Sequence, residues 1–419
     1  MIETKEQPER LILVAVSTGS TDFAEKSLDE LSELVDTAGG ITVGRIIQNR
    51  ENIHPGTYLG SGKLDELIEL LYVTRADGIV CDDELSPAQL RNMEDILKTR
   101  VLDRTLVILD IFAKHATTHE GKIQVELAQL RYRATRLTGM GNSLSRQGGG
   151  IGTRGPGEKK LETDRRILHE RISVLRAELK SVVRHREVTR QKRSDSMLPF
   201  AAVVGYTNAG KSTLFNRLTG AGVLAQDQLF ATLDPSVRMM EGNDGQKLLL
   251  SDTVGFINKL PHNLIEAFKS TLEETKYADM IFHVVDASDP QMDLHMYVVY
   301  DTLRELGITD KPILTIFNKM DLVEKDEEGK PVGYFKDSRA DYVCMVSAVS
   351  GQGMDHLERT IKDMLRSQNI FVEKLFSYQQ LGKMQLLREF GQILTEEYTE
   401  DGVRVTGYIP ARFFANLYD

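Results

Sequence analysis

The sequence is poor in cysteine and has no long apolar run. Its 419 residues include only two cysteines, Cys81 and Cys344, and neither lies in a CxxC or Cys/His spacing. This excludes a disulfide framework and a zinc site of the usual spacing, and fits a reducing compartment. The longest uncharged apolar runs, LILVAV and FAAVVG, are far shorter than the roughly 20 residues of a membrane helix. We therefore expect no transmembrane segment and a cytoplasmic protein.

Signals for export and for several kinds of catalytic site are also missing. The first ten residues, MIETKEQPER, lack the basic-then-apolar order of a signal peptide. None of the nine histidines has a spacing typical of a metal site or a catalytic triad, and no nuclease or methyltransferase constellation is apparent. At about 100 to 200 residues per domain, the chain is expected to form two to four domains.

The charge is distributed unevenly along the chain. The formal net charge is −10, which by itself argues against a nucleic-acid partner. Residues 122–193, however, hold 18 Lys and Arg against 7 Asp and Glu, an excess of 11 positive charges, so the rest of the chain carries −21. One basic segment is therefore attached to an acidic body.

Residues 1–108 alternate strand-like and helix-like stretches. The expected strands are LILVAVS, ITVGRII, GIVCDD and TLVILD, and amphipathic stretches such as FAEKSLDELSELV lie between them. Such alternation predicts a small α/β domain with a mainly parallel sheet.

Residues 109–195 contain two stretches with apolar residues at heptad spacing, which predicts two packed helices. The loop between them, 138–157, carries eight glycines, so we expect an antiparallel helical hairpin with this loop at its tip. A solvated coiled coil is the alternative, but the excess charge and a tip flanked by Arg146 and Arg154 favour an arm that binds a polyanion. The two stripes are Ile123, Leu127, Leu130, Ala134 and Leu137, and Leu168, Ile172, Leu175, Leu179 and Val182.

After a short linker, residues 196–370 have strand-like runs that end at polar loops. FAAVVG, KLLLSD, MIFHVVD, PILTIF and YVCMVS predict a doubly wound, mostly parallel sheet, with the ligand site beyond the carboxyl ends of its strands. Residues 371–419 are expected to form a small C-terminal α+β domain with a helix in GKMQLLREF and a hairpin in EEYTEDGVRVTGYIP.

GYTNAGKS matches GxxxxGK[ST] between a strand and a helix, the pattern of a phosphate-binding loop. We expect Lys211 to reach the β- and γ-phosphates and Ser212 to bind Mg²⁺. The nucleotide-binding residues predicted here are Gly205, Tyr206, Thr207, Asn208, Ala209, Gly210, Lys211, Ser212 and Thr213.

NKMD follows the next-to-last buried strand and predicts guanine specificity. The Asp321 carboxylate can accept from guanine N1–H and N2–H₂ together, while Asn318 and the Lys319 stem hold the base. SAVSG completes the pocket, and the Ala348 amide is expected to donate to guanine O6. The predicted ligand is GTP, and this set comprises Asn318, Lys319, Met320, Asp321, Ser347, Ala348 and Val349.

Two segments between these motifs are expected to sense the γ-phosphate. In DTVG, Asp252 is predicted to hold Mg²⁺, and the Gly255 amide to bond the γ-phosphate. In FATLDP, Thr232 is the expected switch threonine and third Mg²⁺ residue, although an ordinary loop threonine is the alternative. The set is Phe230, Ala231, Thr232, Leu233, Asp234, Asp252, Thr253, Val254 and Gly255.

Phe256 stands where many GTPases have a glutamine that orients the attacking water. Phenylalanine can neither donate nor accept, so a packing role is the simpler interpretation. We expect water positioning to come from the switch backbone, from a partner, or from a potassium ion that Asn208 helps to bind. The residues expected to act in hydrolysis are Lys211, Thr232, Gly255 and Asn208.

The motif set GYTNAGKST, FATLDP, DTVGFI, NKMD and SA resembles the HflX family of translation-associated GTPases. The nucleotide motifs indicate only a P-loop GTPase. ELAQLRYRATRL, RQGGGIGTRGPGE, GTYLGSGKLDEL and LDRTLVILDIFAKHA make the resemblance specific, over nearly residues 10 to 370.

This resemblance implies a monomeric GTPase that binds the large (50S) ribosomal subunit and splits or rescues stalled or stress-inactivated ribosomes. It implies that the hairpin tip contacts ribosomal RNA near the peptidyl-transferase region, and no DNA partner is expected. Glycines allow close approach to RNA, and arginines pair with phosphates or stack on bases. The expected RNA-binding residues are Arg146, Gln147, Gly148, Gly149, Gly150 and Arg154.

Other interpretations stay open. The tip could be a second phosphate loop, although no strand leads to it and it lacks GK[ST]. GSGKLDEL contains GK before a helix, but Thr57 and Leu64 replace the required residues, so a helix capped by Ser61 is favoured. The remaining alternatives are an ATP-dependent RNA-remodelling enzyme that uses Lys63, and a GTP-regulated scaffold for a non-ribosomal protein.

Overall fold

The chain divides into two compact units in the computed structural model. One unit holds residues 1–185, 226–234 and 259–270, and the other holds 186–225, 235–258 and 271–419. The structure describes residues 8–138, 156–195, 198–220, 229–230, 236–242, 246–259, 275–367 and 369–410, with Phe414 and Leu417. The domain boundaries expected above stay predictions.

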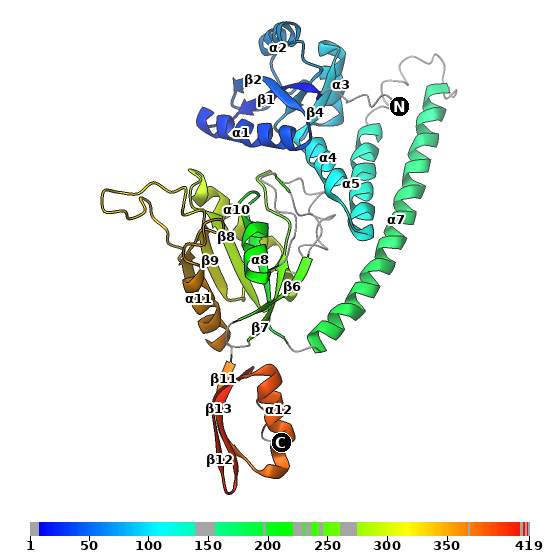
Figure 1. Cartoon of the computed structure of the whole chain (residues 1–419). Coiled ribbons are helices and arrows are strands. Elements are labelled where there is room, and N and C mark those ends of the chain that lie inside the picture. Colours follow the sequence, from blue (N-terminus) through cyan, green and yellow to red (C-terminus); the bar gives the residue numbers. More distant parts are fainter. Residues whose placement is uncertain are drawn as a thin grey trace, which may run out of the picture. The chain divides into compact units, whose positions relative to one another are not determined.

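The first unit contains a four-stranded parallel sheet in the order β2-β1-β3-β4 (Figure 1). Central β1 is apolar and almost wholly buried, as expected for a parallel strand covered on both faces. The predicted parallel α/β architecture is therefore confirmed. Its strands are β1 (Arg10–Ser17), β2 (Ile41–Asn49), β3 (Gly78–Cys81) and β4 (Arg100–Asp103), and its helices are α1 (Thr21–Thr37), α2 (Ser61–Thr74) and α3 (Pro87–Leu97).

The prediction that TLVILD is the fourth strand is wrong. These residues lie in helix α4 (Arg104–His115), and the fourth strand is the preceding RVLD segment. Asp103 caps the helix by accepting from the Leu106 amide at 3.0 Å. The exposed face of this helix is narrow and begins only at Asp110, followed by Ala113 and Lys114, so the run TLVILD is too apolar to show the helical period.

The start of α2 also differs from expectation. Gly60, rather than Ser61, is the N-cap residue, so no side chain caps this helix. The Gly60 amide instead donates to the Gln48 side chain at 2.9 Å. A glycine cap is a common helix start, and nothing in the spacing distinguishes it from a serine cap one residue later.

Helices α5 (His119–Thr138) and α7 (Pro156–Asp195) pack along the two predicted apolar stripes. Arg171 pairs with Glu126 at 2.8 Å, and His119 contacts Glu178 at 3.1 Å. Seven residues forward in one helix correspond to seven residues backward in the other, so the helices are antiparallel. In the described part of the chain, no helix is long and apolar enough to cross a membrane.

The second unit contains a six-stranded sheet in the order β10-β9-β8-β5-β7-β6. Five strands are parallel, as the sequence predicts, and the sixth, β6, pairs antiparallel with β7 at the edge. The strands are β5 (Phe200–Gly205), β6 (Ser236–Glu241), β7 (Lys247–Asp252), β8 (Met280–Asp286), β9 (Ile313–Asn318) and β10 (Tyr342–Met345), and the helices are α8 (Lys211–Thr219), α10 (Met292–Glu305) and α11 (Met354–Ser367).

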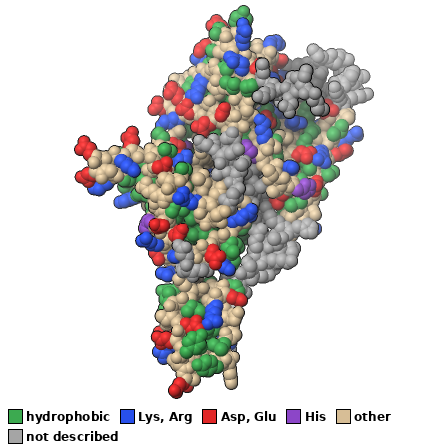
Figure 2. All heavy atoms as spheres, viewed as in Figure 1, with side chains coloured by type: hydrophobic (Ala, Val, Ile, Leu, Met, Phe, Trp, Pro, Cys, Tyr) green, Lys and Arg blue, Asp and Glu red, His purple; other side chains and the backbone are tan. Residues whose placement is uncertain are grey.

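The C-terminal residues form a three-stranded antiparallel sheet with α12 over one face (Figure 1). The predicted helix and hairpin are both present, and Thr399 pairs with Gly402 at the turn. Figure 2 shows hydrophobic side chains on this sheet beside a few charged ones. Its elements are β11 (Asn369–Phe376), the 3₁₀ helix η1 (Tyr378–Gln380), α12 (Leu381–Phe390), β12 (Gln392–Thr399) and β13 (Gly402–Pro410).

Candidate functional site

The loop between β5 and α8 has the backbone of a phosphate-binding loop. Asn208 and Gly210 both have left-handed backbone angles, with φ of +59° and +86°. A Cβ at Gly210 would lie 2.3 Å from Nδ2 of Asn318, so only glycine fits beside that side chain. The loop turns directly into the N-terminus of α8, where backbone N–H groups favour an anion.

Lys211 is buried at the start of α8, and its Nζ donates to the Tyr206 carbonyl at 2.7 Å. Burial lowers the pKa of Lys211 to about 8, although the nearby Asp252 carboxylate raises it. The lysine is therefore mostly charged at neutral pH, and negative phosphate oxygens would stabilise its charged form.

Ser212 and Asp252 lie together at the ends of two neighbouring elements. The Ser212 hydroxyl donates to Oδ2 of Asp252 at 2.8 Å, which brings the carboxyl end of β7 next to the first turn of α8. A hydroxyl and a carboxylate are hard oxygen ligands of the kind that Mg²⁺ prefers. The two residues thus fit the predicted metal role.

The DTVG segment packs directly on the phosphate-binding loop. The Phe256 amide donates to the Gly205 carbonyl at 3.0 Å, and the Thr207 amide donates to the Phe256 carbonyl at 2.8 Å. A Cβ at Gly255 would lie 2.8 Å from Lys211 Nζ, so a larger residue would press on the lysine. The Phe256 side chain is buried, which fits its expected packing role.

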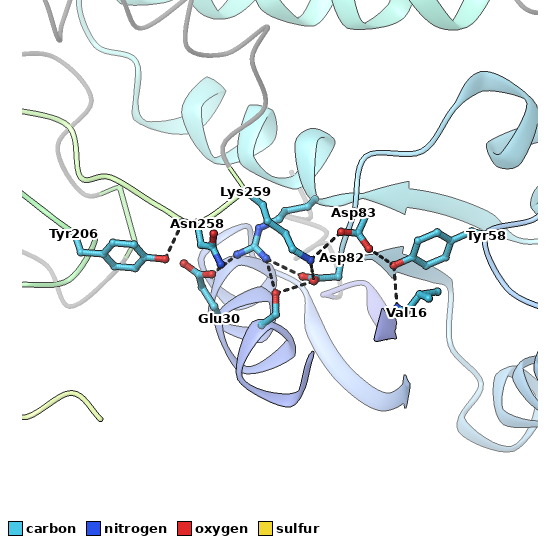
Figure 3. Close-up of polar contacts among 10 residues, drawn as sticks. Val16, Glu30, Tyr58, Asp82, Asp83, Tyr206, Asn258 and Lys259 are labelled. Carbon is cyan, nitrogen blue, oxygen red and sulfur yellow. Dashed lines mark hydrogen bonds and ion pairs between the residues drawn. The ribbon is translucent and has the colours of Figure 1, made fainter. Parts of the chain in front are cut away.

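Tyr206 connects the phosphate-binding loop to the chain beyond DTVG. Its ring stacks on His295 of α10 with centroids 3.7 Å apart, and its hydroxyl accepts from the Asn258 amide at 2.7 Å (Figure 3). The following residue, Lys259, belongs to the first unit, where its Nζ pairs with Asp82 and, at 2.8 Å, with Asp83. The chain therefore passes from one unit to the other between Asn258 and Lys259.

Asn318 joins three of the predicted motifs. Its Nδ2 donates to the Ala209 carbonyl at 2.9 Å, and its Oδ1 accepts from the Ala348 amide at 3.0 Å. The side chain is almost fully buried and thus holds the phosphate-binding loop and the SAVSG loop in fixed relation. Since the Ala348 amide already has this partner, donation to guanine O6 would require the bond to be shared.

The rest of NKMD is arranged around a turn. Lys319 has φ of +62°, and its Nζ pairs with Asp286 at the end of β8 at 2.8 Å. Met320 is buried, and its amide donates to the Val346 carbonyl at 3.1 Å. Asp321 is exposed, which leaves its carboxylate accessible to a ligand.

Some expected site residues do not join this group. Phe230 lies in the first unit, where its ring packs edge-on against Phe112 with centroids 4.6 Å apart. Residues 231–234, including Thr232, lie outside the described residues, and so do the tip residues 146–150 and 154. Their roles stay predictions.

Sequence analysis missed two residues that hold predicted site residues in place. Asp286, which pairs with Lys319, ends a buried strand, and that position was a usable signal. Arg217 of α8 donates to the carbonyls of Ala348 and Val349, and nothing in the sequence indicated it.

The strand order, the phosphate-binding loop and the contacts that join it to DTVG and NKMD define a P-loop GTPase, an enzyme that hydrolyses GTP. Three family models match the chain: "GTP-binding GTPase N-terminal" over residues 25–113, "GTP-binding GTPase Middle Region" over 115–193, and "50S ribosome-binding GTPase" over 200–319.

Relatives name the family more closely. GTPase HflX of Lacrimispora saccharolytica is 60% identical over 419 residues, which cover 100% of this chain and 98% of that protein. GTPase HflX of Escherichia coli is 44% identical over 372 residues, 87% of this chain and 85% of that protein. This chain belongs to the HflX GTPase family.

Solved structures are similar over most of the chain. The complex of SsGBP with GDP is 26% identical, covers 85% of this chain and 98% of its own, and has a TM-score of 0.47. A GTP-binding protein from Sulfolobus solfataricus in complex with GDP has the same identity and coverage, with a TM-score of 0.43.

Proposed function

We propose that this GTPase binds the large ribosomal subunit and splits or rescues stalled ribosomes. GTP favours the ribosome-bound state, and hydrolysis favours release. The match of residues 200–319 to a family described as ribosome-binding supports the partner, and the basic hairpin supports contact with ribosomal RNA.

The hairpin is the observation that carries this proposal. Its apolar stripes pack between α5 and α7, and its outward faces are mainly polar apart from the exposed Ile167 and Val174. Exposed cations on both helices would attract RNA phosphates, and such binding weakens steeply with salt. These exposed residues include Lys122, Arg133, Arg165, Arg176, Lys180 and Arg184.

We further propose that Mg²⁺ is held by Ser212, Thr232 and Asp252. The metal would supply positive charge to the phosphates of GTP. Lys211 would bind the β- and γ-phosphates, and the Gly255 amide would donate to the γ-phosphate. Asn208 is the candidate ligand for a potassium ion, which would offset the lack of a hydrogen-bonding side chain at Phe256.

The test measures the GTPase rate with and without purified large subunits, for the wild type and for a variant that lacks residues 147–157. Splitting is followed in parallel by light scattering of intact ribosomes. The double variant R176E/K180E keeps the tip but reverses charge on the exposed face of α7, and an E170Q variant at an exposed position of the same helix serves as the matched control.

We expect the subunit to stimulate hydrolysis in the wild type and in E170Q, and to stimulate it much less in the deletion and the charge-reversal variants. Stimulation that survives both changes would refute the RNA role of the hairpin. Stimulation without a fall in light scattering would refute splitting and leave binding to the large subunit. Binding that resists salt and RNase would favour a protein partner.

The ATP-dependent alternative gains no support from the geometry. Lys63 pairs with Glu66 of its own helix at 2.7 Å, so its charge is already engaged. An ATPase activity that a Lys63 substitution abolishes, with GTPase retained, would revive this alternative.

A further inference from the structure

Arg217 connects helix α8 to the SAVSG loop. Its Nη1 donates to the carbonyl oxygens of Ala348 at 2.8 Å and of Val349 at 2.9 Å. Two successive carbonyls thus face one guanidinium nitrogen. Hydrogen bonds from a charged donor are roughly twice as strong as neutral ones, so this contact strongly restrains the loop.

The loop is shaped to admit the arginine. Gly351 has φ of +91°, and a Cβ there would lie only 2.3 Å from Nη2 of Arg217. The Gly351 amide donates to the Ser347 carbonyl at 2.8 Å, and the Ser350 amide donates to the Ser347 hydroxyl at 3.0 Å. The loop therefore curls on itself and presents its outer carbonyls to α8.

The position of Arg217 on α8 links the expected phosphate-binding residues to the expected base pocket. Helix α8 begins at Lys211 and Ser212, the residues expected at the phosphates, and Arg217 lies less than two turns further on. Ala348, whose carbonyl it holds, is the residue expected to read guanine O6. A single rigid helix thus fixes the distance between the phosphate-binding end and one side of the base pocket.

We infer that Arg217 is a positioning residue for guanine recognition, acting through the Ala348–Val349 segment. This inference rests on the proposed assignment of Ser347, Ala348 and Val349 to the base. Asn318 holds the same loop from the inside through the Ala348 amide, and Arg217 holds it from the outside. Neither contact involves Asp321, which is expected to accept from guanine N1–H and N2–H₂ on the same edge of the base, so we assign Arg217 to the neighbouring O6 position.

The experiment measures equilibrium affinities for GDP, IDP and 6-thio-GDP by displacement of a fluorescent GDP. IDP lacks the amine that faces Asp321, whereas 6-thio-GDP has a larger, weaker acceptor at position 6. The variants are R217A, R217K and G351A, and R359A on the exposed face of α11 is the matched control. Thermal unfolding of each variant reports folding.

We expect R217A to weaken GDP binding about tenfold, the size expected for losing a charged hydrogen-bond donor. Its preference for GDP over 6-thio-GDP should fall toward one, while its preference for GDP over IDP stays at the wild-type value. R217K should recover part of the loss, and G351A should weaken binding at least as much as R217A, because its methyl group would press on the guanidinium and alanine is strained at a φ of +91°. R359A should match the wild type.

Two results would overturn the inference: GDP affinity of R217A within twofold of wild type, or an equal loss for all three nucleotides. The second result would mean that the arginine only stabilises the fold. Binding of ADP to the wild type distinguishes failure of this inference from failure of the proposed guanine site. A wild type that binds ADP as tightly as GDP would refute the guanine site itself.

Discussion

The Lys259 ammonium group lies between the carboxylates of Asp82 and Asp83, directly after the residue whose amide bonds Tyr206. Asp82 is almost fully buried and also pairs with Arg104 at 2.7 Å. Burial raises the pKa of Asp82, but the charges of Arg104 and Lys259 more than offset this, so its pKa is lowered. The carboxylate is therefore ionised in the folded protein.

Substitutions of Lys259 and of Asp82 should lower the free energy of unfolding by unequal amounts. In K259M, Asp82 keeps Arg104, so we expect a loss of about 1 kcal/mol. In D82N, Arg104 keeps Glu30 and Lys259 keeps Asp83. Both cations lose a buried carboxylate and the buried Ser27 hydroxyl loses its charged acceptor, so the expected loss is about 3 kcal/mol. Urea unfolding followed by circular dichroism measures both, and equal losses would contradict the arrangement.

Nucleotide binding should take up a proton in mildly alkaline solution. With a pKa of about 8, the Lys211 amine is about 90% neutral at pH 9 and about 10% neutral at pH 7. Phosphate oxygens favour the charged form, so GDP binding should take up close to one proton at pH 9 and about 0.1 at pH 7. Calorimetry in buffers of different ionisation enthalpy measures this uptake, and no uptake at pH 9 would refute it.

His283 should make the fold sensitive to mild acid. Burial is the main cause that lowers its pKa to about 4, against an ordinary value of 6.5. The unfolded chain binds the proton first, so stability is full above pH 6.5 and is lost as the pH falls toward 4. The loss is roughly 3 kcal/mol at about 1.4 kcal/mol per pH unit.

The variant H283Q should abolish this loss. Its free energy of unfolding is compared with the wild type at pH 7 and pH 4.5, and H169Q, at an exposed position of α7, is the control. An equal acid response in H283Q and the wild type would assign the sensitivity to other groups.

Potassium should accelerate hydrolysis through Asn208. We expect the intrinsic GTPase rate of the wild type to be higher in potassium than in sodium buffer, and the rate of N208A to be the same in both. GDP affinity measured in each salt checks that N208A still binds nucleotide. A potassium effect that persists in N208A would exclude this ligand.

The sequence predicted the shape of the phosphate-binding loop better than some of the elements around it. Spacing alone predicted the phosphate-binding loop, because its backbone shape requires glycine at Gly210; the role of NKMD in reading the base stays a prediction. It did not identify α4, since the exposed face of this helix is narrow and TLVILD contains only Asp110 from it. It also missed β6, a half-exposed edge strand without a continuous apolar run.

Contacts between residues far apart in the chain could not be predicted, because no local sequence pattern indicates them. Arg217 looks like any arginine on a helix surface, and only the fold brings it to the SAVSG loop. The same holds for Lys259 and Asp82, which are 177 residues apart in the chain.

The register of α5 against α7 relates the length of the hairpin to the number of heptads in its helices. Because its seam repeats every seven residues, adding one heptad to each helix would keep the same faces together and move the tip outward by about 10 Å. Adding three residues to one helix would turn the seam away from its partner instead. The length of this arm is therefore set by the number of heptads in α5 and α7, while Tyr132 and Arg136, which both contact Asp103, attach α5 to the end of β4.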